Sequence, residues 1–202
     1  DRGTLLGQDG ERIEIIDTQK ENKLHICITE SIIKNPHQIF SAEVDARSRS
    51  LISSNHSATH LMHSALREVL GEHVAQKGSL VSDKSLRFDF SHFGKMTDGE
   101  IQKVEIRVNE KIRDSIALKE YRNLPIDEAR SMGATALFGE KYGEFVRVIE
   151  FDPTYSIELC GGTHVKNTSD ISSFKIISEG SQAFGIRRIV ATSNEEVIIA
   201  EG

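Results

Sequence analysis

Two histidine motifs, about a hundred residues apart in the chain, place the strongest constraint on how it can fold. His56 and His60 are four residues apart in NHSATHLMHSALREVLG, and Cys160 and His164 repeat that spacing in ELCGGTHV. Residues four apart on an α-helix share a face, so the two imidazoles of the first motif can bind one ion. The glycine pair of the second motif adopts backbone angles that other residues resist, which allows Cys160 and His164 to converge.

The four side chains form a donor set that is typical of zinc. Three imidazole nitrogens and one thiolate are borderline-soft ligands, and tetrahedral sites of this kind most often bind zinc. The chain has only two cysteines and eight histidines, so both motifs are improbable by chance. The sequence therefore predicts Zn²⁺ at His56, His60, Cys160 and His164, and it leaves open whether the site is structural or catalytic.

Strand and helix patterns divide the chain into two parts. Residues 12–46 contain short alternating segments separated by the turn-forming clusters QKEN and KNPH, which predicts a small β-rich subdomain. From about Ser48 to Leu70 the apolar residues recur at helical spacing, and the histidines lie on the opposite side, toward a predicted cleft. We therefore predict one part at residues 1–47 and another at residues 48–202.

Further strands and helices follow, which predicts an α+β fold. HVAQKGSLV and SLRFDFSH alternate as a hairpin, in which a regular pleat turns the Gln76 amide toward the apolar face unless Gly78 marks a bulge. TDGE fits a capping box, and apolar spacing extends its helix to Ile116. PIDEARSM predicts another helix, and FVRVIEFD, SSFKIISEG and IRRIVATS predict strands.

The composition is that of a globular chain without membrane spans. Its 202 residues, 38% of them hydrophobic, suffice for a buried core, but no apolar run is long enough to cross a bilayer. Cys27 lies in the alternating segment LHICITE, which predicts a small buried thiol. We therefore expect no membrane partner and a cytoplasmic location.

The charge balance limits contact with nucleic acid. A net charge of −6 argues against a free-standing nucleic-acid binder, because phosphate contacts require a concentrated positive surface. Any such role needs a local basic rim. The candidates are Arg67, Lys77, Lys84, Arg87, Lys141, Arg187 and Arg188.

The predicted zinc site favours hydrolysis of an acyl bond. Zinc with an open position lowers the pKa of its bound water to about 7 and polarises a carbonyl. In the zinc protease helix a glutamate follows the first histidine as general base, whereas Ser57 follows His56 here, which favours an activated ester over a peptide. Two alternatives stay open: a Cys160 nucleophile paired with a histidine, and a zinc-stapled RNA-binding module without catalysis.

Several longer motifs resemble a known family. NHSATHLMHSALREVLGEHVAQKGSLVSDKSLRFDFSHF and CGGTHV, together with DTQK, FGEKYG and EGSQAFGIRRI, are similar to the editing domain of bacterial alanyl-tRNA synthetase. The similarity covers nearly the whole chain. The threonyl-tRNA synthetase editing domain shares the HxxxH and CxxxH frame, but VAQKGSLV and CGGTHV indicate the alanyl branch and its free-standing relatives.

The resemblance implies a fold of the threonyl/alanyl-tRNA synthetase common-domain type. A truncated, small β-barrel-like subdomain is expected at residues 1–47 and a zinc-binding editing domain of antiparallel sheet and helices at residues 48–202. The implied reaction is hydrolysis of the ester on tRNA(Ala) whose acceptor end carries serine or glycine. Other domains of the full-length synthetase are implied partners, and no ATP-using aminoacylation domain is expected here. A free-standing deacylase acting in trans is the main alternative.

The resemblance also implies roles for individual residues. The zinc ligands fall on the four residues predicted above, and Gln76 matches a residue needed for deacylation. Thr59 and Ser79 fall where the family lines its amino-acid pocket. A second, hydrolytic site is needed because a pocket shaped for alanine cannot exclude smaller glycine, nor strongly reject serine, which only adds a hydroxyl.

Overall fold

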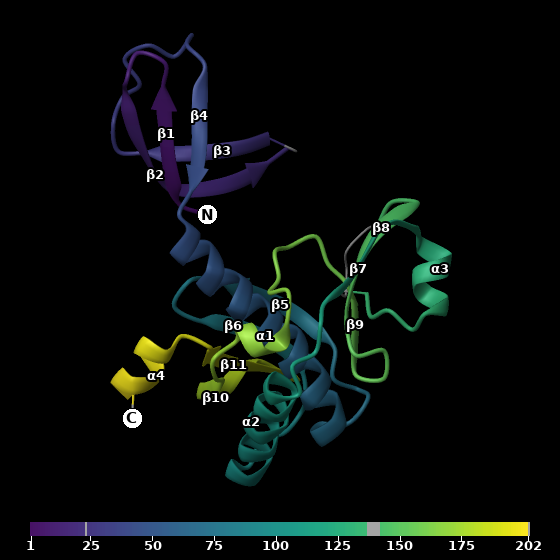
Figure 1. Cartoon of the computed structure of the whole chain (residues 1–202). Helices are drawn as coiled ribbons and strands as arrows, with labels where there is room; N and C mark the ends of the chain where they lie inside the picture. Colours follow the sequence, from purple (N-terminus) through teal and green to yellow (C-terminus); the bar gives the residue numbers. More distant parts are fainter. Residues whose placement is uncertain (23, 137–141, 202) are drawn as a thin grey trace. The chain divides into compact units, whose positions relative to one another are not determined.

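The computed structural model describes residues 1–22, 24–136 and 142–201, and Figure 1 shows its helices and strands. The chain divides into two compact units, Asp1–Ser50 and Leu51–Gly202. The division falls inside α1 (Ala46–Leu70), which carries the first histidine motif. Antiparallel sheets and four α-helices within the described residues match the predicted α+β class.

The first unit contains a four-stranded antiparallel sheet in the order β3-β2-β1-β4. Its strands are β1 (Gly3–Gly7), β2 (Arg12–Glu21), β3 (Leu24–Thr29) and β4 (Phe40–Val44). The last three lie within the predicted β-rich segment, but β1 was not predicted. Its five residues lack a clear alternating pattern, and backbone pairing with β2 on one side and β4 on the other holds it in the sheet.

The prediction that Cys27 is buried is wrong, because its side chain is exposed. Cys27 lies on β3, which is an edge strand of the sheet and, among the described strands, pairs only with β2. Four of the six β3 residues are exposed, and these are the consecutive residues from Leu24 to Cys27. An alternating pattern alone therefore did not reveal that this strand lacks a covered face.

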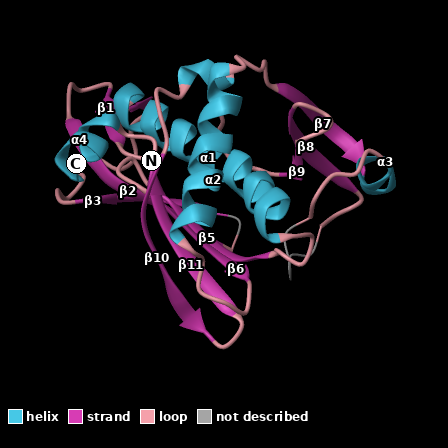
Figure 2. Ribbon diagram, turned by 90° about the horizontal axis from the view of Figure 1, so that it is seen from below, coloured by secondary structure: helices cyan, strands magenta, loops and turns pink. Residues whose placement is uncertain are grey.

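In the second unit, α1 and α2 lie over one face of a four-stranded antiparallel sheet in the order β10-β11-β6-β5 (Figure 2). The bounds are α2 (Asp98–Arg113), β5 (Gln76–Val81), β6 (Leu86–Ser91), β10 (Lys175–Ala183) and β11 (Ile186–Thr192). The core combines fully buried residues from these elements, among them Met62 of α1, Phe88 of β6, Val108 of α2 and Ile189 of β11. This packing fixes α1 against the sheet.

The capping box and the hairpin bulge are confirmed. Thr97 and Glu100 exchange both capping hydrogen bonds at the start of α2, although the helix ends at Arg113 and does not reach Ile116. The β5–β6 register shifts between Gln76 and Gly78. Because of this bulge the Gln76 side chain is only half-buried, and the pleat does not turn it into the apolar core.

A three-stranded antiparallel sheet in the order β7-β8-β9 leads to the second motif. Its strands are β7 (Lys119–Pro125), β8 (Phe145–Phe151) and β9 (Ser156–Leu159), and the remaining elements are α3 (Ile126–Ser131), a 3-10 turn (Thr168–Asp170) and α4 (Glu195–Glu201). The strand prediction for β8 and the helix prediction for α3 are confirmed, whereas β7 and β9 were not predicted. β9 ends directly before Cys160.

Part of the FGEKYG motif, including the basic-rim candidate Lys141, lies outside the described residues. None of the helices in the described part of the chain combines the length and the apolar character of a membrane span.

Candidate metal centre

The histidine side of α1 is largely buried, and His63 and Arg67 border a hollow of about 290 Å³. His60 is 4% exposed and His63 is 2% exposed, while Asn55 and Ser57 of the same helix are completely buried. The helix was expected to cover the core with its apolar face only. Instead, β9 and the loop after it also contact the histidine side, so both sides of α1 are covered around His56 to His63.

The structure brings the four predicted ligands together. The ligand atoms of His56, His60, Cys160 and His164 all lie within 4.8 Å of one another, and we call these residues the metal-ligand cluster. Cys160 Sγ lies 3.5 Å from His56 Nε2 and 3.3 Å from His164 Nε2. Zinc bonds of about 2.0 Å to nitrogen and 2.3 Å to sulfur place two tetrahedral ligands about 3.5 Å apart. The group can therefore hold a metal ion with little rearrangement.

Two of the imidazoles are oriented through their outer nitrogens. His56 Nδ1 donates to the Thr163 carbonyl at 3.2 Å, which leaves Nε2 facing Cys160. His164 Nδ1 lies 3.1 Å from the Ser57 hydroxyl, and the Val165 amide donates to the same oxygen. Such contacts fix the tautomer and the ring orientation of metal-ligating histidines. Sequence reasoning noted only that Ser57 is not a glutamate, and no local pattern indicated its role beside His164.

Burial keeps the imidazoles neutral, which is the form that binds metal. Loss of hydration lowers the pKa of His60 to about 3 and the pKa of His164 to about 2, and it lowers the pKa of His56 as well. Within the described part of the chain, Nδ1 of His60 is buried and has no hydrogen-bond partner. A bound cation would interact favourably with such uncharged donors.

The Gly-Gly loop is shaped to fit His56. A Cβ atom on Gly162 would lie 2.1 Å from Cε1 of the His56 ring, whereas a Cβ on Gly161 would meet no atom within 4 Å. Arg147 of β8 holds the same loop by donating to the carbonyl oxygens of Cys160 and Gly162. The close approach of backbone and imidazole therefore requires glycine at position 162.

The residues predicted to act in deacylation have local contacts. Thr59 is 4% exposed, and its hydroxyl donates to the Asn55 carbonyl one helical turn earlier at 2.8 Å. Gln76 Nε2 donates to the Ser79 hydroxyl at 3.3 Å, and Ser79 is exposed. These contacts do not test a catalytic role, so the assignments of Thr59, Gln76 and Ser79 stay predictions.

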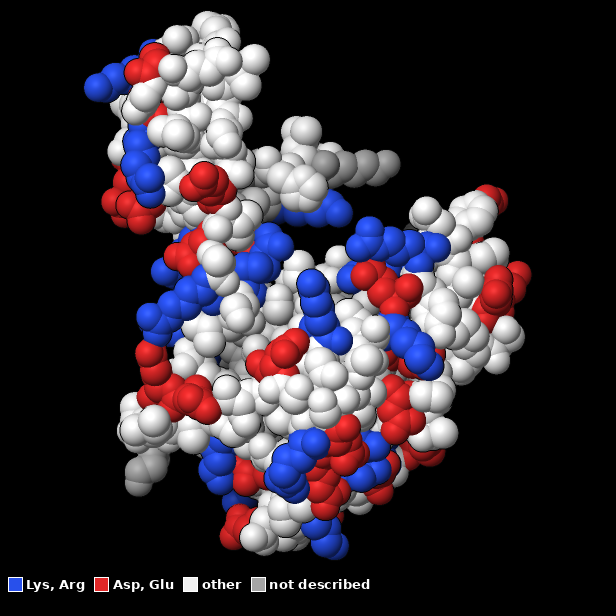
Figure 3. All heavy atoms as spheres, in the orientation of Figure 1, with Lys and Arg blue, Asp and Glu red and all other residues white. Residues whose placement is uncertain are grey.

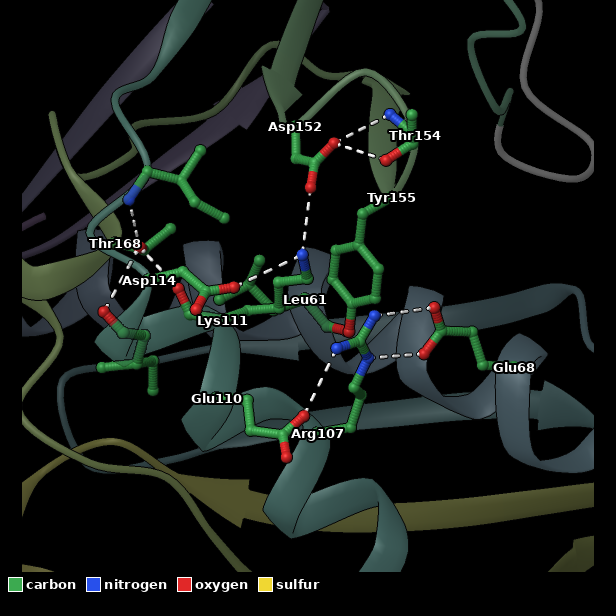
Figure 4. Close-up of polar contacts among 12 residues, drawn as sticks. Leu61, Glu68, Arg107, Glu110, Lys111, Asp114, Asp152, Thr154, Tyr155 and Thr168 are labelled. Atoms are coloured by element: carbon green, nitrogen blue, oxygen red, sulfur yellow. Dashed lines mark hydrogen bonds and ion pairs between the residues drawn. The ribbon is translucent and has the colours of Figure 1, made fainter.

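A second polar cluster contacts α1 one residue after His60 (Figure 4). The Tyr155 hydroxyl donates to the Leu61 carbonyl at 2.8 Å, and the charged groups of Arg107 and Lys111 lie 5.0 and 4.8 Å from the Tyr155 ring centre. Both cations come from α2, and we call Tyr155 with these two residues and their carboxylate partners the Tyr155 cluster. It ties α1 and α2 to the turn that precedes β9.

The predicted basic rim is largely paired with carboxylates. Arg187 bonds to Glu179 and Arg188 bonds to Asp89, each through two nitrogens. Arg67 pairs with Glu72. Figure 3 shows blue and red side chains interspersed on the visible face, which agrees with this pairing. These arginines therefore do not form a free positive surface.

Comparison with known proteins shows which proteins the chain is similar to. The family model described as "Threonyl and Alanyl tRNA synthetase second additional domain" matches residues 146–190, which include Cys160 and His164. The chain is 56% identical over 191 residues to an alanine–tRNA ligase of Cytophaga hutchinsonii and 58% identical over 197 residues to one of Bacteroides thetaiotaomicron. These alignments cover 95% and 98% of the chain. The chain is homologous to a segment of the alanine–tRNA ligases.

The chain spans 22% of the length of these relatives. An alanine–tRNA ligase of Porphyromonas gingivalis is 50% identical over 193 residues, again with 22% of its length covered. The predicted resemblance to alanyl-tRNA synthetase is confirmed. One half of the metal-ligand cluster lies inside the matched range 146–190, and α1 supplies the other half.

Proposed function

We propose that the chain is an editing domain that hydrolyses the ester of seryl- or glycyl-tRNA(Ala) with zinc bound by the metal-ligand cluster. The convergence of four ligand atoms within 4.8 Å, in a chain homologous to alanine–tRNA ligases, is the observation that supports this proposal. A synthetic pocket for alanine needs such a second site, since glycine and serine cannot be rejected adequately by binding alone.

The reaction adds water across one ester bond. The water oxygen bonds to the carbonyl carbon, and the bond from that carbon to the ribose oxygen of the terminal adenosine breaks, which gives free amino acid and tRNA. A bound zinc ion would supply a Lewis acid for the carbonyl or the attacking water. In this proposal Gln76 hydrogen-bonds to the substrate or to that water, and Thr59 and Ser79 line the amino-acid pocket.

The surroundings of the Gly-Gly loop offer space for part of a substrate. A hollow of about 490 Å³ is lined by Gly161, Gly162 and Thr163, together with Arg122 and Phe145. Phe145 is 62% exposed, so its ring is available for contact with a base. We propose that the tRNA acceptor end approaches the cluster from this side.

The same proposal implies partners and a cellular location for the chain. Partners are the tRNA(Ala) acceptor end and other domains of a full-length synthetase, in the cytoplasm. The sheet of the first unit is proposed as part of the small barrel that the family resemblance implies. A free-standing deacylase acting in trans would use the same site residues, but the high identity to alanine–tRNA ligases supports the synthetase.

A deacylation assay with controlled metal content tests the proposed function. Seryl-tRNA(Ala) and glycyl-tRNA(Ala) are incubated with the zinc-loaded chain, with the chain after chelation, and with the chelated chain after zinc is restored. We expect hydrolysis with zinc, loss of hydrolysis after chelation and recovery on restoration, with alanyl-tRNA(Ala) more resistant throughout. A zinc-loaded chain that leaves both mischarged esters intact would contradict the proposal.

RNA binding without catalysis is a second candidate, and one observation favours it. Phe93 and Phe184 are 85% and 96% exposed, and their ring centres lie 6.4 Å apart. Exposed aromatic pairs can stack on unpaired bases. The same assay separates the two functions, because a purely binding module retains tRNA on a filter without releasing the amino acid.

A further inference from the structure

A buried carboxylate contacts the metal-ligand cluster from outside it. Glu158 of β9 is 3% exposed and lies two residues before Cys160, but it is not one of the four clustered ligands. Its Oε1 accepts a hydrogen bond from His63 Nδ1 at 3.0 Å, and its Oε2 lies 3.6 Å from His60 Nε2. The carboxylate thus bridges a proposed ligand and a second buried histidine of α1.

We infer that Glu158 is a positioning residue for the ligand His60, and that His63 in turn holds Glu158. This inference rests on the metal binding in the proposed function. The comparison with the other two imidazoles supports it, because His56 is oriented by the Thr163 carbonyl and His164 by the Ser57 hydroxyl. His60 has only Glu158 in the corresponding role among the described contacts. Carboxylate–histidine–metal arrangements of this kind orient the ring and increase its basicity as a ligand.

Glu158 is buried, so other groups must compensate the charge of its carboxylate. A charged carboxylate in an apolar interior is unfavourable unless other groups compensate it. The hydrogen bond from His63 supplies part of that compensation. When His60 binds a cation, its remaining N–H becomes more polar and supplies a further part. The 3.6 Å separation from His60 is slightly longer than a hydrogen bond, so we expect the contact to shorten when metal binds.

The test measures zinc affinity in two matched variants. Glu158→Gln retains the shape of the side chain and removes its charge. Glu150→Gln is the control, because Glu150 is also 3% exposed, and its described hydrogen bonds go to Lys119 and Tyr121 of neighbouring β7 and not to a histidine. We expect Glu158→Gln to weaken zinc binding by about 10- to 100-fold, measured by competition with a chelating indicator. Glu150→Gln is expected to bind zinc like the wild type.

A cobalt-substituted protein gives a second readout that a purely structural role would not change. The visible absorption of Co²⁺ held by a thiolate reports the geometry of its ligands, so a misoriented His60 in Glu158→Gln should alter the spectrum. The Glu150→Gln spectrum should match the wild type. Thermal unfolding of the metal-free variants checks that both fold.

Substitutions of His63 test the other half of the inference. His63→Leu removes the donor to Glu158 and should weaken zinc binding, whereas His63→Asn keeps an amide nitrogen near the place of Nδ1 and should restore part of the affinity. Equal zinc affinity in Glu158→Gln and wild type would overturn the inference, as would an equal loss in Glu150→Gln. A wild type that binds no zinc would overturn the proposed metal site itself. Wild-type zinc binding without deacylation would contradict only the proposed reaction.

Discussion

The metal-ligand cluster and the Tyr155 cluster both involve α1, at the neighbouring residues His60 and Leu61, but their polar groups are satisfied differently. In the Tyr155 cluster, Arg107 and Lys111 each pair with two carboxylates, so the charges are compensated within the protein. In the metal-ligand cluster the imidazoles are neutral, and a nitrogen of His60 has no hydrogen-bond partner among the described residues. The first arrangement is complete without an ion, whereas the proposed zinc ion would complete the second.

This difference indicates how the two clusters divide their roles. The Tyr155 cluster fixes α1 relative to the turn before β9, and β9 leads directly to Cys160. It therefore stabilises the frame in which the ligands meet. In the metal-ligand cluster a buried nitrogen of His60 lacks a hydrogen-bond partner among the described residues, so the proposed role of this cluster is to bind metal. Variants of each cluster should separate metal binding from stability.

The largest effect is expected from Cys160→Ala. Removing the only sulfur ligand leaves three imidazoles, so the bound zinc should fall from about one ion per chain to a small fraction. Metal analysis of purified protein measures this change. Cys27→Ala is the matched control, because Cys27 is exposed in the first unit. An unchanged zinc content in Cys160→Ala would exclude that thiol as a ligand.

Gln76→His should separate catalysis from metal binding. If the amide bonds to the substrate or water, deacylation of seryl-tRNA(Ala) should fall by about 10²-fold or more, while zinc content stays unchanged. Initial rates of amino acid release measure the loss. Gln102→His, on the exposed side of α2, provides a control substitution of the same kind. A fully active Gln76→His variant would refute the proposed role.

Gly162→Ala should disturb the metal-ligand cluster without removing a ligand. The added Cβ would overlap the His56 ring, so the ring or the loop must shift and zinc affinity should fall by about tenfold. Gly161→Ala adds the same methyl group where no atom lies within 4 Å. Competition with a chelating indicator compares the two variants, and equal affinities would show that the loop adjusts freely.

The smallest effect is expected from Tyr155→Phe. The change removes the hydrogen bond to the Leu61 carbonyl but retains the ring between the two cations, so the free energy of unfolding should fall by about 1 kcal/mol. Urea unfolding of the metal-free protein measures it. Zinc affinity should change little. If Tyr155→Phe instead weakened zinc binding as much as Gly162→Ala, the two clusters would not have separate roles.

The sequence by itself determined the features that depend on local spacing. The i,i+4 histidines, the helix that carries them, the capping box at Thr97 and the bulge at Gly78 are all patterns within a few residues, and each is found in the structure. The glycine pair likewise indicated a tight loop. Local backbone preferences and side-chain periodicity suffice for such features.

Only the tertiary structure decided the features that depend on distant partners. Strands β1, β7 and β9 exist through pairing with their neighbours, and the exposure of Cys27 follows from the edge position of β3. The burial of His60 and His63 follows from β9 and the loop after it. The contacts of Ser57 and Glu158 join residues about a hundred positions apart in the chain. Periodicity describes one segment at a time, so it carries no information about which segment will cover it.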